Sequence, residues 1–346
     1  MRTIQFIALW ALVVSAAACG SSPSSPSASA GTNTSSRPTT TGRVVDAVTG
    51  AAISGVTPNG SEAGRATTST ASDASGAFTV SADTASSTGL AFSFAASGYL
   101  TRSTFVKVPG NAGTVTLIPS SFDLPAFDQL ARSTPSLPVL MRWAAAPALV
   151  VQTQAMTFTG INDTQFTTIN DTMTDGEYVS QVADLNFGLP LMTGGQFSGF
   201  SGTTRVANAA GASVTMLVTG QITIGRFVGL TTATGSVGYS RWQFRSDGTV
   251  TGGMIMMDRD FERSLATTLR AVRVHELGHA LGYNHITTRE SAMNPLAHID
   301  PNALDQAATR LVFMRPPGSR TPDIDPSGFS INRVGDMKLT WSDPIR

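Results

Sequence analysis

Three histidines and a glutamate stand close together in the segment HELGHALGYNH, residues 275–285. His275 and His279 are four residues apart, so on a helix their side chains leave the same face, with Cβ atoms about 5–6 Å apart. Two imidazoles in that arrangement can bind one tetrahedral metal ion. Glu276 follows the first histidine and can reach a water molecule beside such an ion. The pattern therefore predicts a zinc site that uses three of the four histidines in the chain.

The residues that follow this expected helix can end it and supply a third ligand. Gly282 can adopt the left-handed conformation that ends a helix, after which His285 can approach as a third ligand. Three protein ligands leave a fourth position open, which is typical of catalytic zinc and not of structural zinc. Two alternatives remain: a helix with surface histidines, and a metal site that has lost catalysis.

The spacing HExxHxxGxxH, followed eight residues later by Met293, resembles the metzincin peptidases and, within them, the matrixin-like branch. The resemblance covers roughly residues 138–318. It implies an α+β metzincin-like catalytic domain, with a twisted mixed sheet and a zinc-binding helix. A small all-β sandwich domain is expected to precede it, over residues 43–119. The implied roles are zinc ligand for His275, His279 and His285, general base for Glu276, and floor of the metal site for Met293.

Composition limits the function classes. The 346 residues allow about two domains, and the formal net charge is zero with only 13% charged residues. Nothing in this balance favours a nucleic-acid surface or an electrostatic hold on acidic membranes. The single cysteine excludes an intrachain disulfide and a pro-segment thiol that blocks the zinc, because it is Cys19. The chain also lacks a clear acidic loop for structural calcium.

The N-terminus predicts export from the cytoplasm. Residues 1–18 combine Arg2 with an apolar run and resemble a lipoprotein signal peptide, because Ala16–Ala18 stand directly before Cys19. Cys19 is then the lipidation site, which places the protein in a bacterial cell envelope, anchored to the outer membrane. An ordinary secretory signal, with a secreted product, is the alternative. Residues 19–42, rich in Ser, Pro and Thr, predict a disordered tether.

Further boundaries follow from turn residues and prolines. Residues 43–119 show short alternating runs between turns and resemble the carboxypeptidase regulatory-like sandwich, which is either a spacer or a binding module for glycan or protein. Residues 120–137 predict a connector in which Pro125 limits regular structure. The catalytic domain is expected over 138–320. A mostly irregular tail packed on that domain is expected over 321–346, with one short strand pair near Lys338 to Trp341.

Three elements of the catalytic domain can be placed. Thr174 and Glu177 form a capping-box pattern at the start of a helix, with Val179 on its apolar stripe. Gly252–Met257 predicts a strand, and the resemblance implies that this strand borders the cleft and pairs with the substrate. The zinc helix is expected to begin between Ser264 and Thr268.

The predicted function is a membrane-anchored zinc endopeptidase acting on protein or peptide substrates, with no nucleic-acid partner. Water hydrolyses the peptide bond, and Glu276 serves as general base. Two rivals remain. One is a surface lipoprotein whose sandwich domain binds a partner while its zinc domain has lapsed, and the other is a zinc amidase acting on cell-wall peptides.

Overall fold

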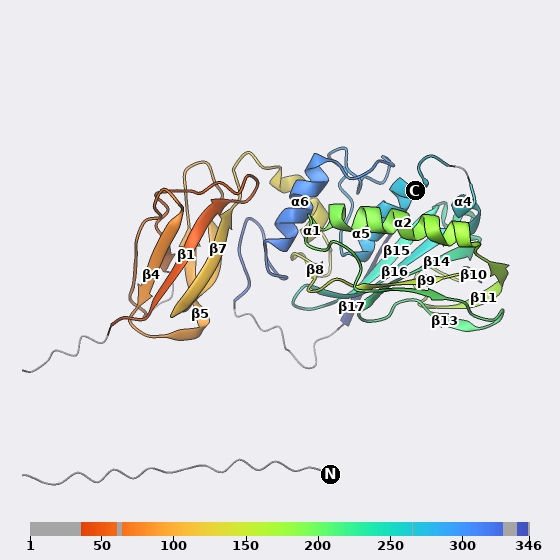
Figure 1. The fold of residues 1–346 in the computed structure, drawn as a ribbon, viewed down its shortest axis with the longest axis horizontal. Helices are drawn as coiled ribbons and strands as arrows, with labels where there is room; N and C mark the ends of the chain where they lie inside the picture. Colours follow the sequence, from red (N-terminus) through yellow and green to blue (C-terminus); the bar gives the residue numbers. More distant parts are fainter. Residues whose placement is uncertain (1–35, 61–63, 265, 328–337, 345–346) are drawn as a thin grey trace, which may run out of the picture. The chain divides into compact units, whose positions relative to one another are not determined.

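The computed structural model describes residues 36–60, 64–264, 266–327 and 338–344 (Figure 1). The predicted signal peptide and Cys19 lie outside these residues, as does most of the predicted tether. Its last residues are described and differ from the prediction, because Thr39–Gly42 begin strand β1 (Thr39–Asp46). The described residues from Arg37 onward form one compact unit.

Strands β1 to β7 form two sheets that share a hydrophobic core. One sheet has the order β3-β4-β1-β7 and the other the order β2-β5-β6. Burial alternates along β4 and β5, so that Phe78, Phe92 and Phe94 face the interior between the sheets. The strands are β1, β2 (Asn59–Gly60), β3 (Thr67–Ser69), β4 (Ala77–Ala82), β5 (Ser86–Phe94), β6 (Arg102–Val108) and β7 (Gly110–Leu117).

The rest of the described chain contains a large mixed sheet with the order β13-β11-β10-β14-β16-β15-β17, while β9 pairs with β14 and β12, and β8 with β16. β14 runs parallel to β16, and β15 antiparallel to it. The strands are β8 (Arg142–Trp143), β9 (Ala148–Gln152), β10 (Gln154–Thr157), β11 (Gln165–Thr172), β12 (Thr203–Val206), β13 (Ser213–Thr215), β14 (Gln221–Val228), β15 (Gly238–Arg245), β16 (Thr249–Asp258) and β17 (Lys338–Pro344).

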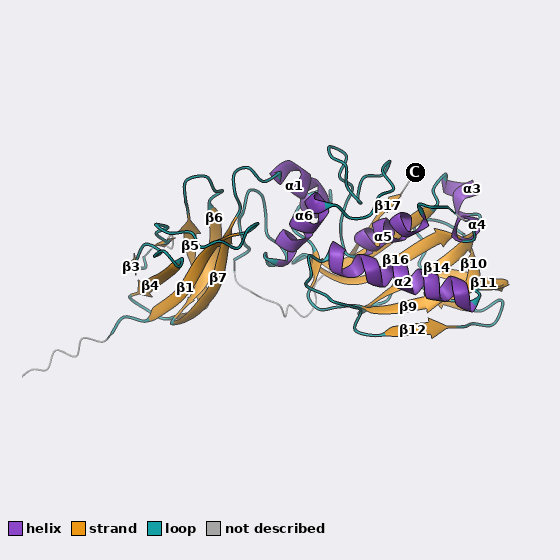
Figure 2. Ribbon diagram, turned by 45° about the horizontal axis from the view of Figure 1, so that its top comes forward, coloured by secondary structure: helices purple, strands orange, loops and turns teal. Residues whose placement is uncertain are grey.

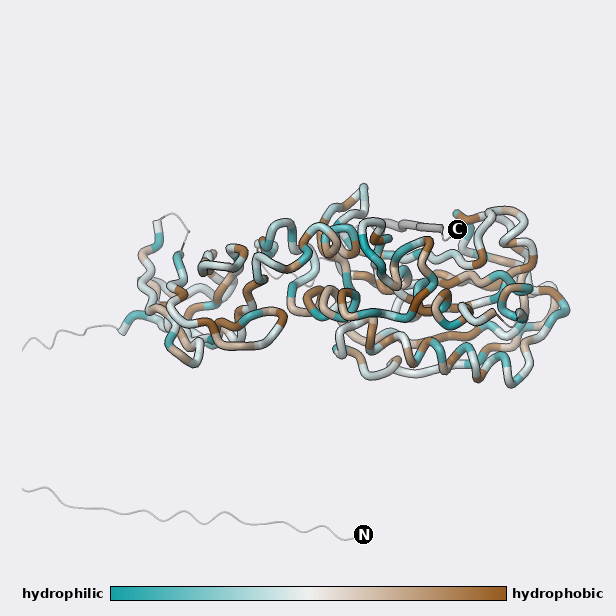
Figure 3. The backbone as a smooth tube through the Cα atoms, turned by 90° about the horizontal axis from the view of Figure 1, so that it is seen from above, coloured by the Kyte–Doolittle hydropathy of each residue, from teal (hydrophilic) through white to brown (hydrophobic). Residues whose placement is uncertain are grey.

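Both faces of this sheet are covered. Along β16, Met254 and Met256 belong to one hydrophobic cluster, whereas Ile255 and Met257 belong to the larger cluster on the helical face. Hydrophobic residues recur along the strands of both parts of the chain (Figure 3). Since β16 is buried on both faces and paired on both edges, it is an interior strand.

Helices α2 and α5 lie on the same face of the sheet (Figure 2). The capping box at the start of α2 is confirmed, since Thr174 and Glu177 exchange side-chain hydrogen bonds with each other's backbone. The apolar stripe is wrong at Val179, which is 62% exposed. The helices are α1 (Leu124–Arg132), α2 (Asp175–Met192), α3 (Leu230–Thr234), α4 (Arg259–Glu262), α5 (Leu269–Ala280) and α6 (Ala303–Phe313).

Helix α1 occupies part of the expected connector, so the prediction that Pro125 limits regular structure there is wrong. Pro125 lies in the first turn, where no intrahelical partner needs its missing N–H. The Asp123 carboxylate accepts a hydrogen bond from the Ala126 N–H at 3.1 Å and so caps the helix. Phe127 and Leu130 bury the inner face of α1 in the main core.

The segment after α6 is held against the strands β6 and β7 by buried ion pairs and hydrogen bonds. Arg315, which is 1% exposed, pairs with Asp323 through two hydrogen bonds of 2.6 and 2.8 Å and donates to the Thr116 carbonyl of β7 at 3.1 Å. Arg102 of β6 pairs with Asp325 at 2.7 Å. The tail then reaches β17, whose seven residues exceed the predicted short strand.

Candidate metal centre

Helix α5 and the loop after it bring the three histidines of the motif together. The Nε2 atoms of His275 and His279 lie 3.0 Å apart, and the Nε2 atom of His285 lies 3.2 Å from the first and 3.1 Å from the second. Two ligand nitrogens on a tetrahedral zinc ion with bonds of about 2.0–2.1 Å are separated by about 3.3–3.4 Å. The triangle of nitrogens therefore has nearly the size that one zinc ion requires.

The outer nitrogens of the first two histidines settle which tautomer they adopt. His275 Nδ1 lies 2.6 Å from the Ala292 carbonyl oxygen, and His279 Nδ1 lies 2.7 Å from that of Tyr283. A carbonyl only accepts, so each Nδ1 carries the proton and each Nε2 presents a lone pair to the centre. Lone pairs that converge in this way repel one another unless a cation lies between them. The donor set fits zinc.

Burial keeps these imidazoles neutral, which is the form that binds metal. His279 is fully buried, and burial lowers its pKa to about 4. Burial, with His279 and His285 close by, also holds the pKa of His275 well below its usual value. The side chains are therefore prepared to bind a cation near neutral pH.

Gly282 ends α5 as the sequence predicts, with a φ of +102°. A side chain at this position would also meet Val250 Cγ2 at 2.7 Å. The loop that follows is fastened to α1, because the Asn284 N–H donates to the Leu130 carbonyl at 2.8 Å. This contact helps to place His285, and the sequence analysis missed it because α1 itself was missed.

Met293 lies fully buried beneath α5, close to the helix backbone. A Cβ atom on Gly278 would lie only 2.3 Å from Met293 Sδ, so glycine is needed for this close approach. The turn is held by Asp305 at the start of α6, which accepts from the Ala292 N–H at 2.8 Å. Since the Ala292 carbonyl orients His275, Asp305 is a positioning residue for the site that the sequence analysis missed.

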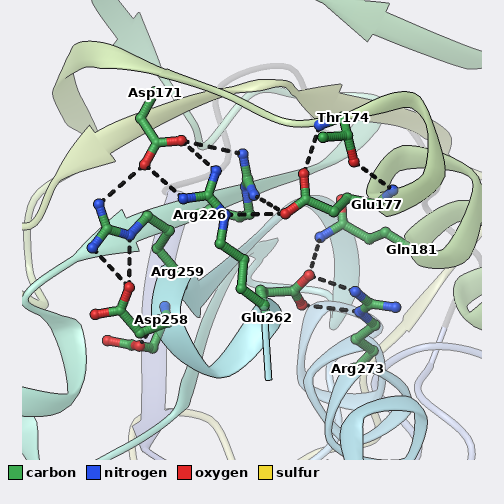
Figure 4. Close-up of polar contacts among 11 residues, drawn as sticks. Asp171, Thr174, Glu177, Gln181, Arg226, Asp258, Arg259, Glu262 and Arg273 are labelled. Atoms are coloured by element: carbon green, nitrogen blue, oxygen red, sulfur yellow. Dashed lines mark hydrogen bonds and ion pairs between the residues drawn. The ribbon is translucent and has the colours of Figure 1, made fainter. Parts of the chain in front are cut away.

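Arg273 anchors α5 two residues before His275. Its guanidinium, 1% exposed, donates to Glu262 of α4 at 2.9 Å and to Asp184 of α2 at 2.6 Å. A neighbouring set of charges joins α2 to β14, where buried Arg226 pairs with Glu177 at 3.0 Å (Figure 4). These charges hold α5, the helix that carries His275 and His279, in place on the sheet.

Strand β15 lines the helical side of the site with alternate residues. Gly238 touches the Glu276 carboxylate, so that a Cβ atom there would lie 2.5 Å from Oε1. Ser240 Oγ donates to the Glu276 carbonyl at 3.0 Å, and Trp242 stacks on His279 with ring centroids 6.2 Å apart. Glu276 is fully buried. Residues two apart on a strand share one face, which explains this alternation.

The strand that borders the site is therefore not the one that the resemblance implied. Gly252–Met257 lies within β16, between β14 and β15 in the sheet. β15 lies on the outer side of β16, and among the described strands only β17 lies beyond it. The expectation that Gly252–Met257 pairs with substrate is wrong, because both edges of β16 are already paired within the sheet. Strand order could not be derived from local sequence, since it depends on which distant strands pair.

The matrixin family model matches residues 216–309. The match includes the histidine motif, Met293 and Asp305, and together with the histidine triad it supports a metzincin-like zinc peptidase domain. The mixed sheet and its helices fit such a domain. Comparison with curated proteins gave no match. Among the described helices, none combines the length and apolarity that crossing a bilayer requires.

Proposed function

We propose that this chain is a zinc endopeptidase in which Glu276 acts as general base. The observation that carries the proposal is that an intact, fully buried glutamate directly follows the first of three histidines whose imidazole nitrogens converge. A site that only stores metal has no use for a buried carboxylate next to its first ligand, because burying that charge is costly.

The chemistry that bound zinc supplies is polarisation of the scissile carbonyl and a lower pKa of the attacking water. The chain's own residues do the rest. Glu276 takes the proton from the water as attack occurs and delivers it to the leaving amine. Gly238 leaves room for its carboxylate, and the carbonyls of Ala292 and Tyr283 keep two imidazoles in the metal-binding tautomer.

The test compares wild-type protein that starts at Gly20 with the isosteric variant Glu276→Gln, on a mixed peptide library. We expect cleavage by the wild type only, with about one zinc ion per chain in both proteins. Equal cleavage by both would refute the role of Glu276. Zinc binding without cleavage of peptides by either, but with release of cell-wall peptides, would favour the amidase. No reaction with either substrate would favour the lapsed zinc domain.

We also propose that the mature protein is held in a bacterial cell envelope by a lipid on Cys19. Support comes from the sequence alone: an apolar segment, small residues before the cysteine, and no other cysteine in the chain. The sandwich of β1 to β7 would then act as a spacer or as a binding module. Partition of the full chain into a detergent phase, and its loss in Cys19→Ser, tests the anchor.

A further inference from the structure

The strand nearest the zinc site does not end the sheet in this structure. β17 pairs with the outer edge of β15, antiparallel, in a register that runs from Tyr239↔Pro344 to Arg245↔Lys338. The opposite edge of β15 is paired with β16. Without residues 338–344, the strand that lines the metal centre would present an open row of backbone donors and acceptors.

That edge lies beside the chemical groups of the site. β15 touches the Glu276 carboxylate through Gly238 and His279 through Trp242. The last residue of β17, Pro344, stands opposite Tyr239, next to Gly238. Neighbouring strands are about 4.8 Å apart, so a chain on this edge passes one strand spacing outside the residues that contact Glu276.

Backbone pairing on such an edge selects an extended peptide without demanding a particular sequence. The chain's own residues 338–344 have adopted this position. Within the described residues, β17 pairs with no strand other than β15. As an edge strand of the described sheet, β17 is held by pairing along one side only, and another extended segment can pair with the same edge of β15 in its place.

We propose that β17 is an internal occupant of the β15 edge, which an extended substrate segment must displace before it can pair there. The proposal rests on the proposed peptidase function. It makes the chain's C-terminal segment a competitive brake: the fraction of molecules with a free edge scales the apparent affinity for peptide. Folded proteins, whose strands are already paired, would be poor substrates.

Two proline variants of the zinc-loaded protein test the brake. In an antiparallel ladder, successive N–H groups point alternately toward and away from the partner strand. Thr340→Pro and Trp341→Pro therefore form a matched pair, in which one loses a hydrogen bond to β15 and the other leaves the ladder intact. We expect one of the two to lower KM for an unstructured peptide about tenfold, with kcat, zinc content and Tm unchanged.

A third protein, which ends at Ser327, removes the occupant altogether. We expect it to show the same fall in KM, and a synthetic peptide of residues 338–346 to inhibit it competitively. Hydrogen exchange of the β15 amides, compared among all proteins, reports whether the edge has opened. An opened edge with unchanged KM in the proline variants and the truncated protein would overturn the proposal.

Failure of the proposed function gives a different result. In the Glu276→Gln background, binding of a fluorescent unstructured peptide can be measured without cleavage. Tighter binding when β17 is released, in a protein whose wild type cleaves nothing, would refute the peptidase function but retain the edge as a peptide-binding site. Unchanged binding after release of β17 would remove the edge from substrate recognition.

Discussion

An alanine at position 238 would intrude on the Glu276 carboxylate. Its Cβ would lie 2.5 Å from Oε1 and 2.9 Å from Cδ, whereas ordinary contacts begin at 3.4 Å. The carboxylate must therefore retreat by about 1 Å. A displacement of that size in a catalytic group lowers a rate by about 100-fold, or about 2.7 kcal/mol of activation free energy.

The fold and the metal should survive this change. Gly238 is not among the glycines with positive φ, so alanine is compatible with its backbone. The contacts that orient His275 and His279 do not involve residue 238. We therefore expect Gly238→Ala to keep zinc and Tm while kcat falls about 100-fold with little change in KM.

The assay is steady-state cleavage of a fluorogenic peptide, with zinc content measured in the same samples. Gly202→Ala is the matched control, because a Cβ at Gly202 meets no atom within 4 Å and its φ is not positive. An unchanged kcat in Gly238→Ala would refute the argument that this contact fixes the general base. If kcat fell in proportion to the zinc content of Gly238→Ala, the argument would also be refuted, because the loss would then come from the metal and not from Glu276.

Three further perturbations test the surroundings of the site. Asp305→Ala should weaken zinc binding about 10–100-fold, because the Met293 turn loses its anchor, as measured by competition with a chelator. Burial would raise the pKa of Glu177, but hydrogen bonds from Thr174 and the nearby arginines outweigh it and lower the pKa to about 2. The contribution of ionised Glu177 to the free energy of unfolding is therefore complete above about pH 4.5 and is lost toward pH 2. Glu177→Gln should lower the free energy of unfolding by about 1–3 kcal/mol at pH 7. Urea denaturation should show that the difference between the two proteins vanishes near pH 2. In the metal-free protein, His279 has a pKa lowered to about 4 from 6.5, so the unfolded chain binds more protons between these values and Tm should fall as the pH drops across that window. A flat Tm from pH 6.5 to 4 would contradict the burial of a neutral imidazole.

The features that could be predicted from the sequence depend on residues close together in the chain. His275 and His279 are brought together by one helical turn, and Thr174 with Glu177 by another. Gly282 ends α5 because its own backbone conformation allows it. In each case the interacting groups are within a few residues, so helical geometry alone places them.

The features that were missed depend on distant segments. Asp305 reaches Ala292 from α6, and Gly238 meets Glu276 from a strand 38 residues earlier in the chain. The order of β15 and β16 in the sheet follows from long-range pairing and not from their composition. Pro125 was misread for a different reason, because proline disfavours a helix interior but is tolerated in a first turn.

The use of main-chain carbonyls to orient His275 and His279 has an evolutionary consequence. The oxygens of Ala292 and Tyr283 remain available whatever side chain these positions carry, provided that the loops keep their course. Substitutions can therefore change the side chains at these positions without turning an imidazole away from the metal. Selection on this centre acts mainly on loop conformation, so homologous centres can diverge far in sequence while they retain the same coordination.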